Sequence, residues 1–188
     1  MNTFLSPIEK PQGLIMKLAY AMTRRQFGKV ITPLHSARLP PAFGLFYSKI
    51  SKLDKKLLLP PETALLIREQ VARINMCLFC IDIGRWATIK ASMSEAKFEA
   101  LPEYSTSPLF TEAERAALDY VTELTREKKV SQGTFDRLAA HYSEREICEI
   151  TWLVSTNHLF NINNLGLGIG SDGLCEINRG PQPASSSS

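Results

Sequence analysis

The residues best suited to chemistry in this chain are Cys77 and Cys80, which lie in the heptapeptide MCLFCID. Two thiols in a CxxC motif can form a disulfide on oxidation and reopen on reduction, which is a complete redox cycle. The thiolate is the reactive form, and the free N–H groups and dipole at the start of a helix favour it. The motif alone also allows a zinc site or a pair of inert structural cysteines.

The zinc interpretation has little support in the rest of the sequence. A structural zinc site needs four ligands, commonly a second CxxC or a pair of histidines. The other two cysteines, Cys148 and Cys175, stand alone, and the three histidines are dispersed. We therefore expect neither a metal nor an organic cofactor. Cys148 falls on an apolar helical face, so we expect it to be a buried, inert thiol, and Cys175 receives no role.

Composition indicates a globular protein of one domain, or of one domain with an arm. The chain has 188 residues, of which 44% are hydrophobic and 22% charged, enough to build a sizeable core. A net charge of +3 is too small to indicate nucleic acid as a partner. No apolar run approaches the roughly 20 residues of a membrane span, and the first ten residues do not resemble a secretion signal. We expect a cytoplasmic protein without a membrane partner, in a compartment where a CxxC pair cycles.

Two helices must position the cysteines. The apolar periodicity is helical throughout, so the expected fold class is all-α. The segment Pro60-Pro61-Glu62 is a strong helix start, because proline suits the first turn and an acidic residue complements the positive helix end. That helix should end near Asn75, and a second should run from about Leu78 or Phe79 to Ile89 or Lys90. The CxxC motif then lies at the start of the second helix.

The remaining elements divide the chain into three regions. We expect an N-terminal helical arm at 1–58, with helices at 13–27 and 42–51, a core domain at 59–178 and a disordered tail at 179–188. Within the core, S/T-x-x-E spacings predict capping boxes, and Ser131 is expected to begin a shorter helix. The three expected boxes begin at Ser92, Thr111 and Ser143.

The segment 66–82, LIREQVARINMCLFCID, resembles the core motif of the carboxymuconolactone decarboxylase and alkylhydroperoxidase-D-like (AhpD-like) family. That motif is a helix ending in an asparagine, one further residue, and a CxxC that opens the next helix. Segments 110–118, 130–131, 142–147 and 157–164 resemble the family in order and spacing, so the resemblance covers roughly 59–176. It implies a helical domain with a central antiparallel helical hairpin, assembled into homo-oligomers, commonly trimers or hexamers.

The resemblance also implies an activity. Peroxidase members of the family use the second cysteine to attack the peroxide and the first to resolve the sulfenic acid as a disulfide. Cys80 is then the attacking thiol and Cys77 the resolving one. A dithiol donor, such as a lipoyl group or a small redox protein, returns the electrons, and no cofactor is needed.

The sequence departs from the family at two positions of its proton relay. The histidine found four residues after the second cysteine is Gly84 here, and the glutamate found twelve residues before the first cysteine is Leu65. Glu69 lies one helical turn after Leu65, on roughly the same face. Glu69 and Asp82 are therefore the candidate catalytic proton carriers beside the two cysteines. If the geometry of the pocket is otherwise intact, restoring the relay by Gly84→His is expected to raise turnover.

Each candidate also has a plainer interpretation. Glu69 could be a surface residue that pairs with Arg73, and Asp82 could complement the start of the CxxC helix. We expect His158 to be a partly buried histidine with its hydrogen bonds satisfied. Three asparagines are unusual for a helix interior and could cap a helix or bond to the buried hairpin: Asn161, Asn163 and Asn164.

Three functions remain open at the level of sequence. The first is a thiol-dependent peroxidase or disulfide reductase acting on a peroxide or another small molecule. The second is a carboxymuconolactone decarboxylase-like lyase, although decarboxylase members often lack the CxxC pair. The third is a non-catalytic helical oligomer with a redox-sensitive CxxC. Reversible oxidation of Cys77 and Cys80 coupled to turnover is required only by the first.

Overall fold

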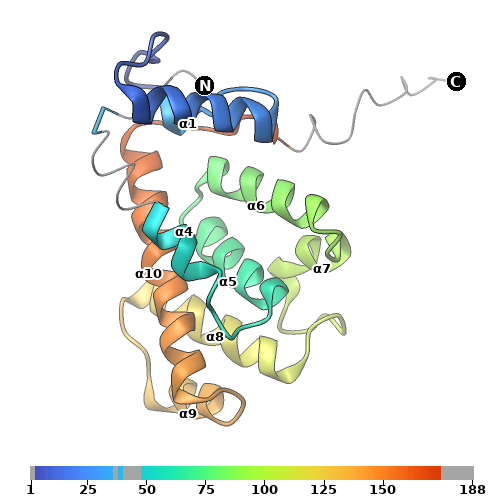
Figure 1. The fold of residues 1–188 in the computed structure, drawn as a ribbon. Coiled ribbons are helices and arrows are strands. Elements are labelled where there is room, and N and C mark those ends of the chain that lie inside the picture. The colour runs from blue at the N-terminus through green and yellow to red at the C-terminus, as the bar shows by residue number, and fades with distance from the viewer. Residues whose placement is uncertain (1–2, 36–37, 40–47, 175–188) are drawn as a thin grey trace, which may run out of the picture.

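The computed structural model describes residues 3–35, 38–39 and 48–174. Within these ranges the chain forms helices and no strands, which confirms the expected all-α class (Figure 1). A short 3-10 helix, η2 (Leu101–Glu103), follows α7. The α-helices are α1 (Leu14–Phe27), α2 (Thr32–His35), α4 (Ser48–Asp54), α5 (Pro61–Ile74), α6 (Leu78–Lys90), α7 (Glu95–Glu99), α8 (Glu112–Glu127), α9 (Gln132–Ala139) and α10 (Glu144–Gly166).

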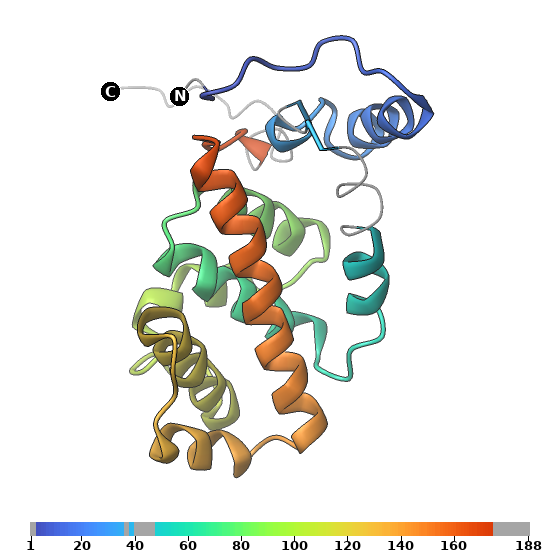
Figure 2. The ribbon, with the colours of Figure 1, turned by 90° about the vertical axis from the view of Figure 1, so that its left-hand side faces the viewer.

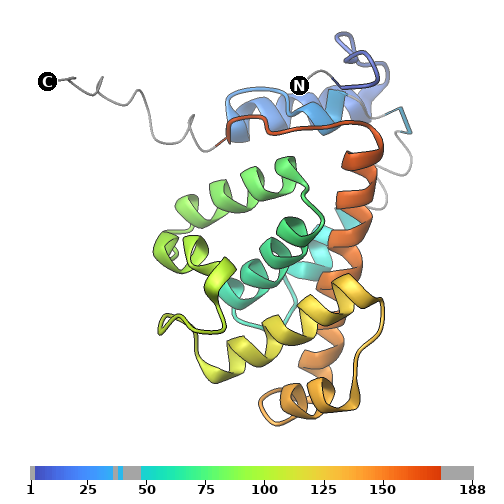
Figure 3. The same ribbon diagram turned by 180° about the vertical axis from the view of Figure 1, so that it is seen from behind.

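Helix α5 lies at the centre of the molecule. It packs against α6, α8 and α10, and it forms with α6 the antiparallel hairpin that the resemblance implied (Figures 1 and 3). Its residues Ile67 and Val71 are fully buried in the main core cluster together with Val121 of α8 and Ile150 of α10. Helix α10 runs along the length of the molecule and reaches the N-terminal region (Figure 2). The hairpin is therefore held from several sides, which gives the CxxC turn a firm support.

The turn between α5 and α6 explains where the cysteines lie. Met76 adopts a left-handed backbone conformation with φ of 54°. The Cys77 N–H donates to the Ala72 carbonyl at 2.9 Å, and the Met76 N–H donates to Arg73 at 3.0 Å, so α5 ends in a Schellman-type turn. The chain reverses there, and Cys77 becomes the N-cap residue of α6. The predicted helix end at Asn75 and start at Leu78 are both confirmed.

The predicted helix caps are confirmed with one exception. Thr111 and Ser143 each form a complete capping box, and Ser131 caps α9. The prediction at Ser92 is wrong, because Ser94 is the N-cap of α7. Ser92 has a φ of 54° and belongs to the turn that ends α6, so it is not available to begin a helix. A spacing rule cannot distinguish a helix start from the tight end of the preceding helix.

Helix α1 of the N-terminal arm lies on the side of α6 that faces away from α5 (Figures 1 and 3). Helix α1 is next to α6 and to the segment that follows α10 (Figures 1 and 3). Most of the helix expected at 42–51 lies outside the described residues, as do Cys175 and the expected tail at 179–188, while α4 is described from Ser48 onward. In the part of the chain that the structure describes, no helix is both long and apolar enough to cross a membrane.

Candidate functional site

Cys77 and Cys80 form a disulfide, with their Cα atoms 5.3 Å apart. Cys77 is fully buried at the N-cap of α6, whereas Cys80, in the first turn, is half-buried. Cys80 lines a cavity of about 620 Å³, and Cys77 is not among the residues of its wall. The two sulfurs are therefore not equivalent, because only Cys80 faces space that a substrate can occupy.

Two asparagine amides of α10 point their N–H groups at the sulfurs. Asn161 Nδ2 lies 3.0 Å from Cys80 Sγ, and Asn164 Nδ2 lies 3.4 Å from the same sulfur and 3.8 Å from Cys77 Sγ. Both asparagines are buried. When the disulfide is reduced, donors in these places stabilise a thiolate more than a neutral thiol, and the start of α6 acts in the same sense. The arrangement therefore favours a reactive sulfur at Cys80.

The amide cluster extends to His158. Asn75 Nδ2 donates to Asn161 Oδ1 at 2.9 Å and lies 3.2 Å from His158 Nδ1. Burial, with a smaller contribution from Lys128, lowers the pKa of His158, so its ring is neutral near pH 7. Its Nε2 is buried with no hydrogen-bond partner among the described residues, so the expectation of a satisfied histidine holds for Nδ1 only. His158 thus helps to orient the amides that donate to the sulfurs.

Glu69 is buried rather than exposed. Its side chain has no exposed surface, and its Oε1 accepts from Arg73 Nε at 2.7 Å, so the pairing with Arg73 is confirmed and the surface position is wrong. Its other oxygen, Oε2, is buried with no partner among the described residues. Burial raises the pKa of Glu69 to about 7, against the opposing effect of Arg73. A carboxyl group with this pKa can both accept and donate a proton near neutrality.

Gly84 makes room for this carboxylate. A Cβ at position 84 would lie 2.7 Å from Glu69 Oε2, closer than such contacts occur. Gly84 lies one helical turn after Cys80, so both residues are on the same face of α6. Glu69 and Gly84 also line the same cavity as Cys80. The carboxylate therefore occupies the space in which a histidine at position 84 would begin. The condition of an otherwise intact pocket is not met, so we no longer expect Gly84→His to raise turnover.

Gly84→Ala is predicted to destabilise the protein although alanine favours helices. The added methyl group must displace the Glu69 carboxylate, at a cost of about 1–3 kcal/mol. The matched control is Gly133→Ala in α9, where the nearest atom to a new Cβ is an arginine nitrogen at 4.0 Å. That variant should gain up to about 1 kcal/mol from helix propensity. Thermal unfolding of both variants tests the prediction, and an equal rise in their midpoints would contradict it.

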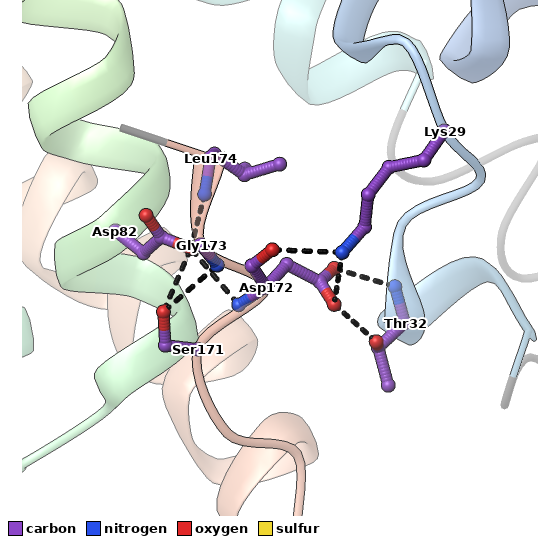
Figure 4. A network of polar contacts seen from close by, with 7 residues as sticks. All are labelled: Lys29, Thr32, Asp82, Ser171, Asp172, Gly173 and Leu174. Atoms are coloured by element: carbon purple, nitrogen blue, oxygen red, sulfur yellow. Dashed lines mark hydrogen bonds and ion pairs between the residues drawn. The ribbon is translucent and has the colours of Figure 1, made fainter. Parts of the chain in front are cut away.

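Asp82 lies outside the cavity. It is buried on α6 beyond the first turn, so it does not complement the helix start. Its Oδ2 accepts from Ser171 Oγ at 2.9 Å and from the N–H groups of Asp172 and Leu174 at 2.9 and 3.0 Å (Figure 4). Cys80 and Glu69 thus line one cavity, with Cys77 bonded to Cys80, whereas Asp82 lies in the anchor of the C-terminal segment.

The prediction that Cys148 is buried is wrong. Its thiol is free and exposed, because α10 turns the neighbouring side chains of Ile147 and Glu149 inward and leaves Cys148 facing outward. The resistance to oxidation that we expect of Cys148 therefore cannot come from burial. Among the described residues, no group of three or more His, Cys, Asp or Glu side chains is placed to hold a metal ion.

No family model matches the chain. The uncharacterised protein YnjA of Escherichia coli K12 is 30% identical over 176 residues, which cover 92% of this chain and 96% of YnjA. The chain belongs to the same family as YnjA. Its fold is AhpD-like, as the resemblance implied.

Two solved structures illustrate this fold. The alkylhydroperoxidase AhpD core of Ralstonia eutropha JMP134, an uncharacterised peroxidase-related protein, gives a TM-score of 0.69 at 16% identity and covers 95% of this chain and 100% of that one. The debrominase Bmp8, as a variant with one cysteine replaced by alanine and in complex with 2,3,4-tribromopyrrole, gives a TM-score of 0.76 at 21% identity, with 93% and 94% covered.

The expectation that the asparagines of α10 could bond to the buried hairpin is confirmed for Asn161 and Asn164, but the sequence did not predict that sulfurs are their partners. The amide-rich run in α10 was visible, and Asn161 and Asn164 are three residues apart, which places them on one helical face. That spacing, together with Asn75 directly before the CxxC turn, is the signal that could have identified the cluster. The Cys80 sulfur that accepts from these amides is on α6, so the contact exists only because α10 packs on the hairpin, and the sequence of α10 alone does not show it.

Proposed function

We propose that this protein is a thiol-dependent peroxidase or disulfide reductase in which the Cys77–Cys80 pair supplies two electrons to a small-molecule substrate. The observation that carries the proposal is the environment of Cys80. Its sulfur accepts from two buried amides and lines a cavity that also contains a buried carboxyl group with a pKa of about 7.

With a hydroperoxide as substrate, the Cys80 thiolate attacks the terminal peroxide oxygen. The O–O bond breaks, the alcohol leaves with a proton, and Cys80 becomes a sulfenic acid. The Cys77 thiolate then attacks the Cys80 sulfur, which forms the disulfide and releases water. One hydroperoxide is thus reduced to an alcohol and water while two thiols are oxidised.

Glu69 is the proposed proton carrier for these steps. As a carboxylate it accepts the proton of the Cys80 thiol, and as a carboxylic acid it donates that proton to the leaving oxygen. Glu69 would then replace both the glutamate that the family has at position 65 and the histidine that it has at position 84, since the Glu69 carboxylate occupies the space beside Gly84. Asp82 stays a weaker candidate because its described contacts are with the C-terminal segment.

The proposed electron donor is a dithiol, such as a lipoyl group or a small redox protein. Thiol–disulfide exchange begins with attack on an accessible sulfur, and Cys80 is the less buried sulfur of the pair. Such a cycle requires a reducing compartment, for which we propose the cytoplasm.

Counting thiols tests the proposal directly. One equivalent of hydrogen peroxide added to the reduced protein should remove two free thiols, and peptide mapping should find Cys77 joined to Cys80. Cys148 should stay reduced, because it lacks the helix-start position and the buried amide donors of Cys80. Addition of a dithiol should then permit repeated turnover. Oxidation of Cys148 before the pair, or a disulfide without turnover, would count against the proposal.

A homo-oligomer is proposed because apolar side chains surround the exposed end of the hairpin. Contiguous exposed apolar surface often marks an interface. Light scattering at micromolar concentration should give a mass well above the 21.0 kDa of one chain, with a trimer or hexamer expected. A mass near that of one chain would refute this assembly. The exposed residues are Met76, Leu78, Leu159, Ile162 and Leu165.

Reductive dehalogenation is a second candidate, favoured by the likeness to the debrominase over most of both chains and by the size of the cavity. The same dithiol could supply its two electrons: an aryl bromide becomes the arene, bromide leaves, and the pair closes to a disulfide. Incubation of the reduced protein with 2,3,4-tribromopyrrole should then release one bromide per disulfide formed. A decarboxylase-like lyase would need no such oxidation.

A further inference from the structure

The cavity beside Cys80 is not made by the core domain alone. Part of its wall comes from the N-terminal arm, through the apolar residues Leu5, Ile31, Pro33 and Leu39. A volume of about 620 Å³ is typical of sites for molecules of many atoms, whereas hydrogen peroxide is scarcely larger than one water. The arm thus turns the neighbourhood of Cys80 into a chamber much larger than the smallest peroxide requires.

Two buried carboxylates tie this arm to the redox helix. Asp82 of α6 accepts from the backbone and Ser171 of the C-terminal segment, as described above (Figure 4). Asp172 in that segment accepts from the Thr32 N–H at 2.7 Å and from the Thr32 hydroxyl, and it pairs with Lys29 Nζ at 3.3 Å. Lys29 also donates to the Asp172 carbonyl at 2.7 Å. The chain of contacts runs from α6 through the segment to the arm.

Apolar packing supports the same junction. The Phe27 and Trp86 rings pack with their centroids 4.6 Å apart, and both belong to a cluster with Ile169 and Leu174. Ile31, which lines the cavity, packs against this cluster and lies directly before Thr32. The anchor at Asp172 therefore fixes the part of the arm that contributes Ile31 and Pro33 to the wall.

Two of the three charged side chains that line the cavity, Arg68 and Glu69, form ion pairs. Arg68 pairs with Asp54 at 2.6 Å, and Glu69 accepts from Arg73. Arg38, on the arm, donates to the Ser6 carbonyl at 2.8 Å. A chamber whose walls are mostly apolar suits a largely apolar molecule.

We infer that the arm is the specificity element of this site, and that Asp82 and Asp172 are positioning residues that hold it over Cys80. The selected substrate is largely apolar and considerably bulkier than hydrogen peroxide, with its reducible group directed at Cys80. The expected preference for a bulky peroxide over hydrogen peroxide rests on the proposed thiol chemistry. The expected binding of a bulky apolar molecule in the cavity does not depend on that chemistry.

The kinetic test compares hydrogen peroxide with cumene hydroperoxide as oxidants of the full-length reduced protein. Each rate is divided by the rate of the same oxidant with dithiothreitol, to remove intrinsic reactivity. The wild type should prefer cumene hydroperoxide by about tenfold or more, since burial of an apolar group in a fitted site gives discrimination of this order. No preference would overturn the inference.

Asp172→Ala should remove that preference by raising KM for cumene hydroperoxide, with kcat and the hydrogen peroxide rate within about twofold of wild type. Asp172→Asn keeps an acceptor for the Thr32 N–H and should restore part of the preference. The control is Asp136→Ala, which removes an exposed carboxylate on α9 and should behave as wild type. Equal loss with both oxidants would overturn the inference. If Asp172→Ala does not fold, Ile31→Ala must show the same selective rise in KM.

A binding measurement separates this inference from the proposed function. Ligand-observed NMR should detect 2-phenyl-2-propanol, an unreactive relative of cumene hydroperoxide, bound to the wild type and much less to Asp172→Ala. Binding of this kind without any peroxide turnover would support the chamber while the peroxidase proposal fails. Turnover of hydrogen peroxide without such binding would overturn the inference and leave the peroxidase proposal intact.

Discussion

Cys80→Ser is expected to abolish turnover, because it removes the only sulfur of the pair that lines the cavity. A serine hydroxyl is scarcely ionised at neutral pH and cannot be oxidised to a sulfenic acid, so no later step can replace the first. The rate of the variant should fall to that of the uncatalysed reaction between the dithiol donor and the peroxide. Steady-state reduction of cumene hydroperoxide by dithiothreitol measures it.

Two further variants test the roles of the other thiols, Cys77 as the resolving thiol and Cys148 as a thiol outside the reaction. Cys77→Ser should consume one equivalent of peroxide and then stop, because the sulfenic acid at Cys80 has no neighbouring thiol to resolve it. Cys148→Ser should turn over as wild type, since Cys148 is exposed on α10 and does not line the cavity. Full activity of Cys80→Ser would reject the redox account in favour of the lyase or the non-catalytic oligomer.

Glu69→Gln is expected to lower the rate of Cys80 oxidation by about 10²-fold or more, because a positioned general acid–base group typically contributes a factor of 10²–10⁴. In the wild type the rate should depend on pH with an inflection near pH 7, where Glu69 titrates. That inflection should disappear in the variant. An unchanged rate and pH profile would limit Glu69 to its pairing with Arg73.

The same substitution should alter stability in a pH-dependent way. A folded-state pKa raised from 4.5 to about 7 means that the fold binds a proton more tightly than the unfolded chain. The wild type therefore loses stability as pH rises from about 5 to 8, by up to about 3 kcal/mol. Glu69→Gln should lack this decline, whereas Glu127→Gln, at an exposed position, should keep it. Denaturant unfolding at pH 5 and pH 8 measures the difference.

Local signals account for the elements that could be predicted from the sequence. The proline-led start of α5, the asparagine at its end and the capping boxes at Thr111 and Ser143 each depend on residues close together in the chain. The position of the CxxC at a helix start follows from the same signals. The capping box predicted at Ser92 was wrong because Ser92 instead belongs to the turn that ends α6. That turn depends on the backbone conformation of Ser92 alone, which the spacing of residue types does not show.

The site depends on contacts that a linear pattern does not contain. Whether Glu69 is exposed is decided by α6, whose Gly84 leaves space for the carboxylate. The partners of Asp82 lie about 90 residues later in the chain, and loops at that separation carry no periodic signal. The prediction that Cys148 is buried was wrong for a related reason. Helix α10 packs along its length against several helices, so the apolar residues near Cys148 in the sequence did not identify the buried face of α10.

The most direct test of the account is the identity of the first sulfur to be oxidised. In Cys77→Ser, peroxide should leave a sulfenic acid that dimedone traps, and mass spectrometry should place the adduct on Cys80. The account predicts this single adduct, formed more slowly when Glu69→Gln is added. An adduct on Cys148 alone, or none on Cys80 while the wild type still turns over, would contradict it.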